Sequence, residues 1–272
     1  MIKMNAQRIV VKVGTSSLIN SNGTINRSSI NGLADVLCGL KRSGKEVVLV
    51  SSGAIGAGMG ILGLERRPTR IPEQQAVAAV GQGELIGIYE RRFAKYGVSV
   101  AQMLLTRDVL LYPQSKQNVS NAFQELMKLN VIPIVNENDT VSVEELDHMT
   151  KFGDNDKLSA IVAEVIDADL LIMLSDIDGF YTGNPSTDPN AELIPEVTNL
   201  NQSILSEFAG GKGTEFGTGG MKAKLNAAKR VLENNQQMVL ANGKDPHIIE
   251  DILAGKKVGT LFRNVDDIRR VE

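Results

Sequence analysis

The chain has 272 residues, of which 22% are charged, and a formal net charge of −3 at neutral pH. No run of Lys or Arg is long enough to form a basic stripe, which excludes the common modes of nucleic-acid and acidic-lipid binding and favours a small-molecule partner. Cys38 is the only cysteine, so an intrachain disulfide is excluded and a reducing compartment is expected.

Nothing in the sequence indicates secretion or membrane insertion. Residues 1–7 lack the apolar core of a signal peptide, and no stretch of about 18 apolar residues occurs anywhere. We therefore expect a soluble cytoplasmic protein without a membrane or nucleic-acid partner. A single domain over 1–272 is expected, since α/β sheets of roughly 200 to 250 residues commonly form one domain.

Short apolar runs alternate along the chain with helical patterns. The runs are rich in Val, Ile and Leu and are unbroken by polar residues, which is typical of parallel strands buried on both faces. We predict strands at 8–13, 47–50, 98–104, 131–135, 170–174 and 238–240, and helices at about 27–43, 73–96, 115–130, 157–166, 221–234 and 246–254. This alternation predicts a three-layer αβα sandwich with a central, mainly parallel sheet. The stretch 180–216, rich in Asn, Pro, Gly and Thr, is expected to form loops or a hairpin.

Four polar segments each follow a predicted strand directly. They are residues 12–16, 51–54, 136–140 and 175–179. The carboxyl ends of parallel strands share one edge of an open sheet, where ligands bind in a crevice. We therefore expect these four distant segments to converge on one ligand site.

The first of these segments, Lys12-Val13-Gly14-Thr15-Ser16, suits a phosphate. Backbone N–H groups of a glycine turn can point at anionic oxygens while the lysine supplies a positive charge. The alternative is a solvated lysine at a strand end. A second lysine-bearing glycine loop, Gly217–Lys224, precedes a predicted helix that begins near Met221, and its alternative is a flexible loop with exposed lysines. If the fold joins the two loops, the chain handles a nucleoside triphosphate, with Lys224 a better catalytic candidate than Lys222.

Two acidic, amide-rich segments flank the span 142–151. They read Asn136-Glu137-Asn138-Asp139 and Phe152-Gly153-Asp154-Asn155-Asp156. Turn chemistry alone favours Asn, Asp and Gly, so each segment taken singly could be only a loop. Together they bring several carboxylates near the strand edge, and one of residues 154–156 is expected to cap the helix that starts near Lys157.

Several familiar motifs are absent or misplaced. No GxxxxGK[ST] occurs, which excludes a Walker-type NTPase. Gly58-Met59-Gly60-Ile61-Leu62-Gly63 matches GxGxxG but begins several residues after its strand, so we interpret it as a chance match. His148 and His247 share no metal-ligand spacing with Cys38, and neither follows an apolar strand as a hydrolase triad would require. The helix at 73–96, with Ala76, Val77, Ala79, Val80, Ile86 and Ile88, is interpreted as buried packing.

Taken together, these motifs resemble the glutamate 5-kinase family within the amino acid kinase superfamily. The resemblance runs in order from about residue 8 to 263, and the pair Asn136-Glu137-Asn138-Asp139-Thr140 and Phe152-Gly153-Asp154-Asn155-Asp156 is its most specific part. A threonine is common in the family where this chain has Ser175, a change that keeps the hydroxyl. Many members carry a C-terminal PUA domain, and we expect none here because the sequence ends at Glu272.

The resemblance implies a role for each candidate residue. Lys12 and Lys224 would contact the ATP phosphates and the transferring phosphoryl group, with Asp156 organising both lysines. Glutamate would be held by Ser52, Gly53, Asp139, Asp154 and Asn155. The nucleotide site would comprise Lys12, Ser175, Asp176, Thr218, Gly219, Gly220, Met221, Lys222, Ala223 and Lys224. No metal ligand is assigned, because phosphates and water often supply most of the Mg²⁺ shell.

The resemblance also implies the reaction and its partners. The chain would use ATP and Mg²⁺ to phosphorylate the side-chain carboxylate of L-glutamate, the first step of proline biosynthesis. Its glutamate side would cover about 1–165 and its nucleotide side about 166–272. Proline is implied as a feedback inhibitor, glutamyl phosphate reductase as a downstream partner, and a homodimer or homotetramer as the assembly.

Two alternatives stay open at this point. One is a sibling kinase acting on N-acetylglutamate, aspartate, carbamate or UMP, which would share the lysine and glycine loops. Asp139 discriminates against several of these, because a free α-amino group needs an anionic partner. The other alternative is a non-catalytic sensor of amino acids or nucleotides, against which the set Lys12, Asp156 and Lys224 argues.

Overall fold

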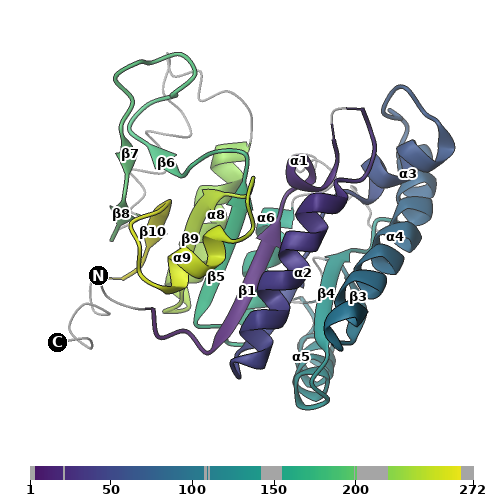
Figure 1. Cartoon of the computed structure of the whole chain (residues 1–272), viewed down its shortest axis with the longest axis horizontal. Helices are drawn as coiled ribbons and strands as arrows, with labels where there is room; N and C mark the ends of the chain where they lie inside the picture. Colours follow the sequence, from purple (N-terminus) through teal and green to yellow (C-terminus); the bar gives the residue numbers. More distant parts are fainter. Residues whose placement is uncertain are drawn as a thin grey trace.

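The structure is a computed structural model that describes residues 4–20, 22–106, 109, 111–141, 155–198, 200 and 220–264. Within these residues the core of the molecule is an eight-stranded sheet with the order β3-β4-β2-β1-β5-β9-β10-β8 (Figure 1). The central strands are β1 (Arg8–Val13), β2 (Glu46–Val50), β4 (Ile132–Glu137) and β5 (Leu170–Ser175), flanked by β3 (Val100–Leu105) and β9 (Gln237–Asn242). All six predicted strands are therefore present.

Pairing in the sheet is mainly parallel, as predicted. β1 pairs in parallel with β2 on one side and β5 on the other, and β2–β4, β3–β4 and β5–β9 are parallel as well. Only β10 (Thr260–Phe262) runs antiparallel to β9, and it pairs in parallel with the short β8 (Glu196–Val197). The carboxyl ends of β4, β2, β1 and β5 consequently lie side by side at one edge.

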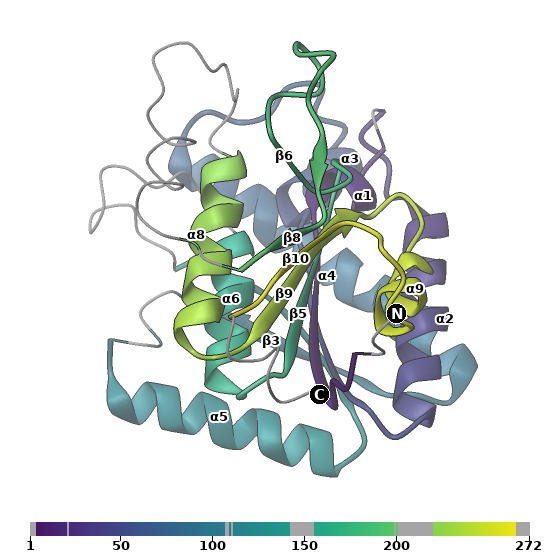
Figure 2. The same ribbon diagram turned by 90° about the vertical axis from the view of Figure 1, so that its left-hand side faces the viewer.

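Helices cover both faces of the sheet in three layers (Figure 2). One face carries α5 (Pro113–Lys128), α6 (Asn155–Val165) and α8 (Gly220–Glu233), and the other carries α2 (Arg27–Arg42), α4 (Ile71–Phe93) and α9 (Ile248–Leu253). Short helices α1 (Thr15–Leu18) and α3 (Ala54–Leu62) and the 3₁₀ turn η1 (Ala94–Tyr96) complete the set of described helices. Among them, none combines the length and apolarity needed to cross a membrane.

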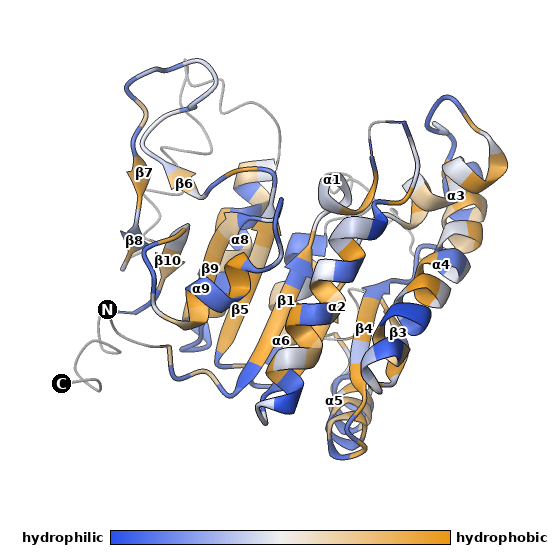
Figure 3. Ribbon diagram, in the orientation of Figure 1, coloured by the Kyte–Doolittle hydropathy of each residue, from blue (hydrophilic) through white to orange (hydrophobic). Residues whose placement is uncertain are grey.

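The unbroken apolar strands bury both of their faces. Alternate β1 residues enter opposite cores: Val10 packs with the α5, α6 and α8 side, and Ile9 and Val11 pack with the α2, α4 and α9 side. Figure 3 shows the same pattern, with apolar strands in the centre and polar residues on the outer faces of the helices. Each strand thus stabilises two layers at once.

The described part of 180–216 includes a hairpin, in agreement with the sequence prediction. β6 (Phe180–Tyr181) pairs antiparallel with β7 (Leu193–Ile194) outside the main sheet. Thr260 Oγ1 ties this hairpin to β10 by accepting from the Phe180 N–H at 2.8 Å and donating to the Ile194 carbonyl at 2.6 Å. Residues 201–216 lie outside the described part of the chain.

The sequence prediction missed helix α3 and was wrong about part of α4. The glycines of the GxGxxG match lie in and just after α3, where they allow α3 to approach α4 closely: a Cβ on Gly58 would lie 1.9 Å from the Val77 carbonyl oxygen. Val77 and Ile88 are buried as expected. Ala76, Ala79 and Val80 are exposed instead, because this part of α4 packs on α3 through Val77 and Ala78 and leaves its other side uncovered.

Candidate active site

The first turn of α6 brings the predicted site together. This helix begins at Asn155, two residues earlier than predicted, so Asn155 and Asp156 lie inside its first turn and neither caps it. Both side chains are buried, with residue exposures of 7% and 6%. The two adjacent residues contact different groups: Asp156 binds two lysines, and Asn155 binds the ends of β2 and β4.

Asp156 bridges the two lysines of the glycine-rich segments. Lys12 Nζ, at the end of β1, lies 2.5 Å from Asp156 Oδ1, and Lys224 Nζ, from the first turns of α8, lies 3.0 Å from Asp156 Oδ2. The side chains of Lys12 and Lys224 are only 8% and 12% exposed. Residues 12, 156 and 224, far apart in sequence, thus form one ionic cluster, which we call the lysine bridge.

The electrostatics of the lysine bridge leave a net positive charge. Burial by itself raises the pKa of Asp156, but the charges and hydrogen bonds of Lys12 and Lys224 outweigh it and hold the pKa of this carboxyl below its usual value. Asp156 is therefore ionised at neutral pH. Two ammonium groups around one carboxylate make a buried cation, which favours an anionic ligand because unpaired buried charge is costly.

The glycine turn after β1 packs directly against the lysine bridge. A Cβ on Gly14 would lie 3.5 Å from Lys12 Nζ and 3.8 Å from the Leu174 carbonyl oxygen. Val13 is in register with Leu174 of β5, so the next residue of β5, Ser175, sits beside the same turn. Ser175 Oγ donates to Asp176 Oδ1 at 3.0 Å, and this aspartate is exposed at the edge of the sheet.

Neutral amides and hydroxyls form a second cluster, centred on Asn155. Its Nδ2 lies 2.9 Å from the Ser51 carbonyl oxygen, 2.8 Å from Ser52 Oγ and 3.1 Å from Asn136 Oδ1. Ser51 and Ser52 follow β2, and Asn136 belongs to β4, which extends two residues beyond its predicted end. This group, the amide cluster, is buried and uncharged.

One acceptor of the amide cluster has no partner. Asn155 Oδ1 is buried and accepts no hydrogen bond from the residues that the structure describes. A buried carbonyl oxygen of this kind costs free energy until a donor reaches it. It is therefore the atom of the cluster that remains for a donor group on a ligand.

Asp139 adds an acidic group shortly after β4. Burial, and to a smaller extent the neighbouring Glu137 charge, raise the pKa of Asp139 to about 6, although the Arg67 charge lowers it in part. Such a carboxyl is mostly ionised at neutral pH and is stabilised by an additional cation. An ammonium group on a ligand would supply that cation.

The remaining candidates fall into three groups. Gly53 starts α3 with a φ of 92°, a left-handed conformation that favours glycine. Gly220, Met221, Lys222 and Ala223 form the first turn of α8 beside Lys224, and Lys222 is exposed. Asp154, Thr218 and Gly219 lie outside the described residues.

Sequence reasoning missed two residues of α4 that join the amide cluster. Asn136 Nδ2 donates to Gln82 Oε1 at 2.7 Å, and Tyr89 Oη lies 3.0 Å from Ser51 Oγ. Ser51 and Asn136 stood within the polar segments that follow strands, so the signal for them was present. Gln82 and Tyr89 lie within a helix, and no local motif marks them.

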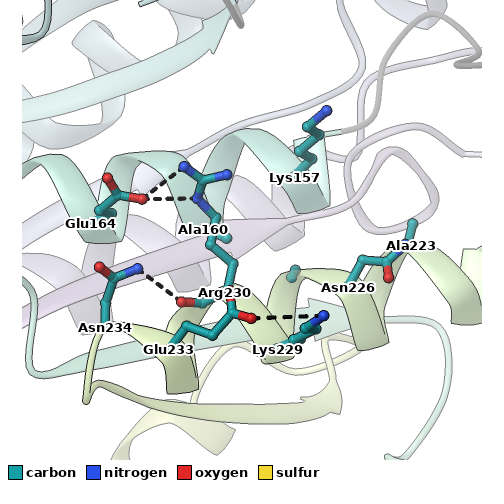
Figure 4. A pocket seen from close by; sticks show the side chains of 10 residues that line it. Lys157, Ala160, Glu164, Ala223, Asn226, Lys229, Arg230, Glu233 and Asn234 are labelled. Carbon is teal, nitrogen blue, oxygen red and sulfur yellow. Dashed lines mark hydrogen bonds and ion pairs between the residues drawn. The ribbon is translucent and has the colours of Figure 1, made fainter. Parts of the chain in front are cut away.

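A groove of about 550 Å³ lies between α6 and α8, and none of the three residues of the lysine bridge lines it (Figure 4). Its charged residues largely pair with one another. Glu164 binds Lys116 at 2.8 Å and Arg230 at 2.8 Å, and Lys229 lies 3.7 Å from Glu233. The pairs of Glu164 join α6 to α5 and α8, whereas the Lys229–Glu233 pair lies within α8.

Comparison with known proteins gives a consistent result. Residues 7–242 match the sequence profile of the Amino acid kinase family. The chain is 61% identical over 257 residues to a glutamate 5-kinase of Enterococcus faecalis, covering 94% of each chain. It is 59% identical over 260 residues to a glutamate 5-kinase of Lactiplantibacillus plantarum, covering 96% of this chain and 98% of that protein.

Solved structures support the fold. An isopentenyl phosphate kinase from T. acidophilum superimposes with a TM-score of 0.64 at 17% identity, covering 94% of this chain and all of that one, 100%. A UMP kinase from Ureaplasma parvum gives a TM-score of 0.64 at 20% identity, covering 96% of this chain and 100% of that one. At these identities the likeness concerns the fold alone, and it agrees with the αβα sandwich predicted from the sequence.

Proposed function

The chain belongs to the glutamate 5-kinases of the amino acid kinase family, and we infer from this membership that it transfers the γ-phosphoryl group of ATP to the side-chain carboxylate of L-glutamate. The product is L-glutamyl 5-phosphate, the first intermediate of proline biosynthesis. Neither a sibling kinase nor a non-catalytic sensor is favoured by relatives of this identity.

The single observation that carries the mechanism is the lysine bridge. We propose that Lys12 and Lys224 contact the phosphoryl group in transit, supported by their burial and by the net positive charge around Asp156. Negative charge spreads over the phosphoryl oxygens in the transition state, so fixed cations lower the barrier. Asp156 would hold both ammonium groups apart and in place, which avoids reorganisation during the reaction.

The chemistry needs no general base. A γ-carboxylate oxygen of glutamate forms a bond to the γ-phosphorus of ATP while the bond from that phosphorus to the β–γ bridging oxygen breaks, and ADP leaves. The attacking carboxylate has a reference pKa of about 4.3 and is ionised at neutral pH. This fits a site whose described side chains are lysines, carboxylates, amides and hydroxyls.

The nucleotide is proposed to enter as Mg·ATP beside β5 and α8. Ser175, Asp176 and residues 218–224 are the candidates that line its path. For Ser175 and residues 220–224 the support is their position next to the lysine bridge. Within the described part of the chain, no cluster of three His, Cys, Asp or Glu side chains could hold a metal. We propose that Mg²⁺ arrives on the phosphates, which together with water often supply most of its coordination shell.

Glutamate is proposed to bind at the amide cluster. Asn155 Oδ1 and the Asp139 carboxylate would accept from its α-ammonium group, while Ser52, Gly53 and Asp154 complete the site. The support is the buried oxygen of Asn155, which no described residue contacts by a hydrogen bond, and the raised pKa of Asp139, which a cation would lower. Bound there, the substrate would extend its γ-carboxylate toward the lysine bridge.

Further properties of the family are proposed for this chain. They are a glutamate side over about 1–165 and a nucleotide side over about 166–272, feedback inhibition by proline, a cytoplasmic location, delivery of product to glutamyl phosphate reductase, and a homodimer or homotetramer. The assembly has some support in the exposed apolar residues Ile61, Leu62, Leu64 and Val80 on and beside α3 and α4.

Trapping the product with hydroxylamine tests the function. The enzyme is incubated with Mg·ATP and with glutamate, N-acetylglutamate or aspartate in turn, and the hydroxamate is measured. Hydroxamate from glutamate alone is the expected result. Hydroxamate from another acid would reassign the substrate, and no hydroxamate from any acid together with tight ATP binding would indicate a sensor.

A further inference from the structure

Helix α4 reaches the amide cluster at two points that the proposed reaction does not use. Gln82 and Tyr89 are seven residues apart, two helical turns, so their side chains leave the same face of α4. Gln82 contacts the end of β4 and Tyr89 contacts the end of β2. These are the two strand ends that hold Asn155.

Gln82 and the Glu137 backbone N–H together set the orientation of the Asn136 amide. Asn136 Nδ2 donates to Gln82 Oε1 at 2.7 Å. Asn136 Oδ1 then faces the other way, where it accepts from the Glu137 N–H at 2.9 Å and from Asn155 Nδ2 at 3.1 Å. A flipped Asn136 would place a donor against two donors.

The orientation passes on to Asn155. Its Nδ2 is held by two acceptor-only oxygens, those of Asn136 and of the Ser51 backbone. The opposite atom of this amide, Oδ1, is consequently the one without a partner among the described residues. Acceptors and donors thus alternate along the chain of contacts: Gln82 Oε1 accepts from Asn136, Asn136 Oδ1 accepts from Asn155, and Asn155 Oδ1 remains for a donor on a ligand.

Tyr89 secures the other end of the cluster. It is 1% exposed, its hydroxyl lies 3.0 Å from Ser51 Oγ, and its ring packs edge-on against Phe93 at 6.3 Å between centroids. Ser51 is itself buried at 2% exposure. The Ser51 carbonyl, which holds Asn155, is therefore fixed through a neighbouring hydroxyl that α4 supports.

We propose that Gln82 and Tyr89 are positioning residues that hold Asn136 and Ser51 so that Asn155 presents Oδ1, not Nδ2, to the glutamate α-ammonium group. The proposal rests on the proposed function for the identity of the ligand. Neither side chain needs to touch substrate. Their effect passes through Asn155, because hydrogen-bond networks in a buried site orient their members together.

The first test separates substrate affinity from turnover. Gln82→Met removes the acceptor at nearly equal length and should raise KM for glutamate about tenfold, the usual effect of one lost buried hydrogen bond, with KM for ATP changed less than twofold. Gln82→Glu keeps an acceptor oxygen and should restore KM to within about threefold of wild type. Gln117→Met on α5, where the glutamine is exposed, is the matched control.

The second test shows whether Gln82 acts through Asn155. In an Asn155→Ala background, Gln82→Met should raise KM for glutamate by less than about twofold, since residues acting as one unit are not additive. Tyr89→Phe should raise it about threefold, and Tyr112→Phe, at an exposed tyrosine, should not. Additive effects, or equal rises in KM for both substrates, would overturn the proposal.

Failure of the positioning role can be told apart from failure of the proposed kinase function. If wild-type enzyme forms no hydroxamate from glutamate, the function fails before any variant is compared. If wild type is active and Gln82→Met keeps wild-type KM values with an unchanged melting temperature, only the positioning role fails.

Discussion

The lysine bridge and the amide cluster are built from adjacent residues, Asp156 and Asn155, yet they differ in every electrostatic respect. The lysine bridge holds three full charges with a net excess of one positive charge. The amide cluster holds only neutral donors and acceptors, one of which has no partner in the described part of the chain. The first turn of α6 thus supports two regions. One is suited to stabilising the charge that develops in the transition state, and the other is suited to recognising the substrate by neutral hydrogen bonds.

The contrast predicts a division of labour. Fixed cations gain most where charge moves during the reaction, so the lysine bridge should affect turnover. Neutral hydrogen bonds contribute equally before and during the reaction, so the amide cluster should affect substrate binding. Variants in the two regions should therefore separate into two kinetic classes.

The largest effect is expected at the lysine bridge. Lys12→Met or Lys224→Ala should lower kcat by about 100-fold to 1,000-fold, because each removes a charge placed for the transition state. Steady-state assays at saturating glutamate and ATP measure the change. Lys128→Met on the exposed face of α5 is the matched control, and near wild-type turnover in both active-site variants would end the two-lysine mechanism.

The next effect is expected at the amide cluster and Asp139. Asp139→Ala or Asn155→Ala should raise KM for glutamate about tenfold to 100-fold, the range for a hydrogen bond to a charged group, and should change KM for ATP by less than twofold. Initial rates with each substrate varied in turn give both constants. Asn118→Ala on exposed α5 controls for loss of an amide, and equal changes for both substrates would reassign the two residues.

A pH profile probes the acidic part of the glutamate site. The pKa of Asp139 is raised to about 6, so its carboxyl is neutral below that pH and loses its attraction for an ammonium group. The value of kcat/KM for glutamate should therefore fall below pH 6, by up to tenfold per pH unit, while kcat changes less. In Asp139→Asn the value should be low at pH 8 and should no longer fall through pH 6, and a wild-type profile in this variant would assign the titration elsewhere.

The sequence was sufficient for the central sheet and for the edge that carries the site. Unbroken apolar runs predicted parallel strands, and the polar segments after those strands predicted that Lys12, Ser52 and Asn136 would lie at one edge of the sheet. Both predictions depend on short-range sequence patterns, and the tertiary structure agrees with them.

Helix α3 and the role of α4 could not be predicted in this way. Gly56, Gly58 and Gly60 weaken the helical signal of α3, and the helix is stabilised by close packing on α4 that no local pattern shows. The spacing of Gln82 and Tyr89 places them on one face of α4. It does not say which strands that face meets.

The smallest effect tests whether the position of α4 matters to the amide cluster. A Cβ on Gly81 would lie 1.8 Å from the Ala54 carbonyl oxygen, so Gly81→Ala must push α3 and α4 apart, at a cost of about 1 to 3 kcal/mol in the free energy of unfolding. Gln82 is the next residue and should move with the helix, raising KM for glutamate by about twofold to fourfold. The lysine bridge comes from β1, α6 and α8, so kcat should stay near wild type. Gly83→Ala is the matched control on the same helix, because its Cβ meets nothing within 4 Å and alanine favours a helix, so the melting temperature should hold or rise. A fall in kcat without a change in KM would show that α4 supports the charged region instead.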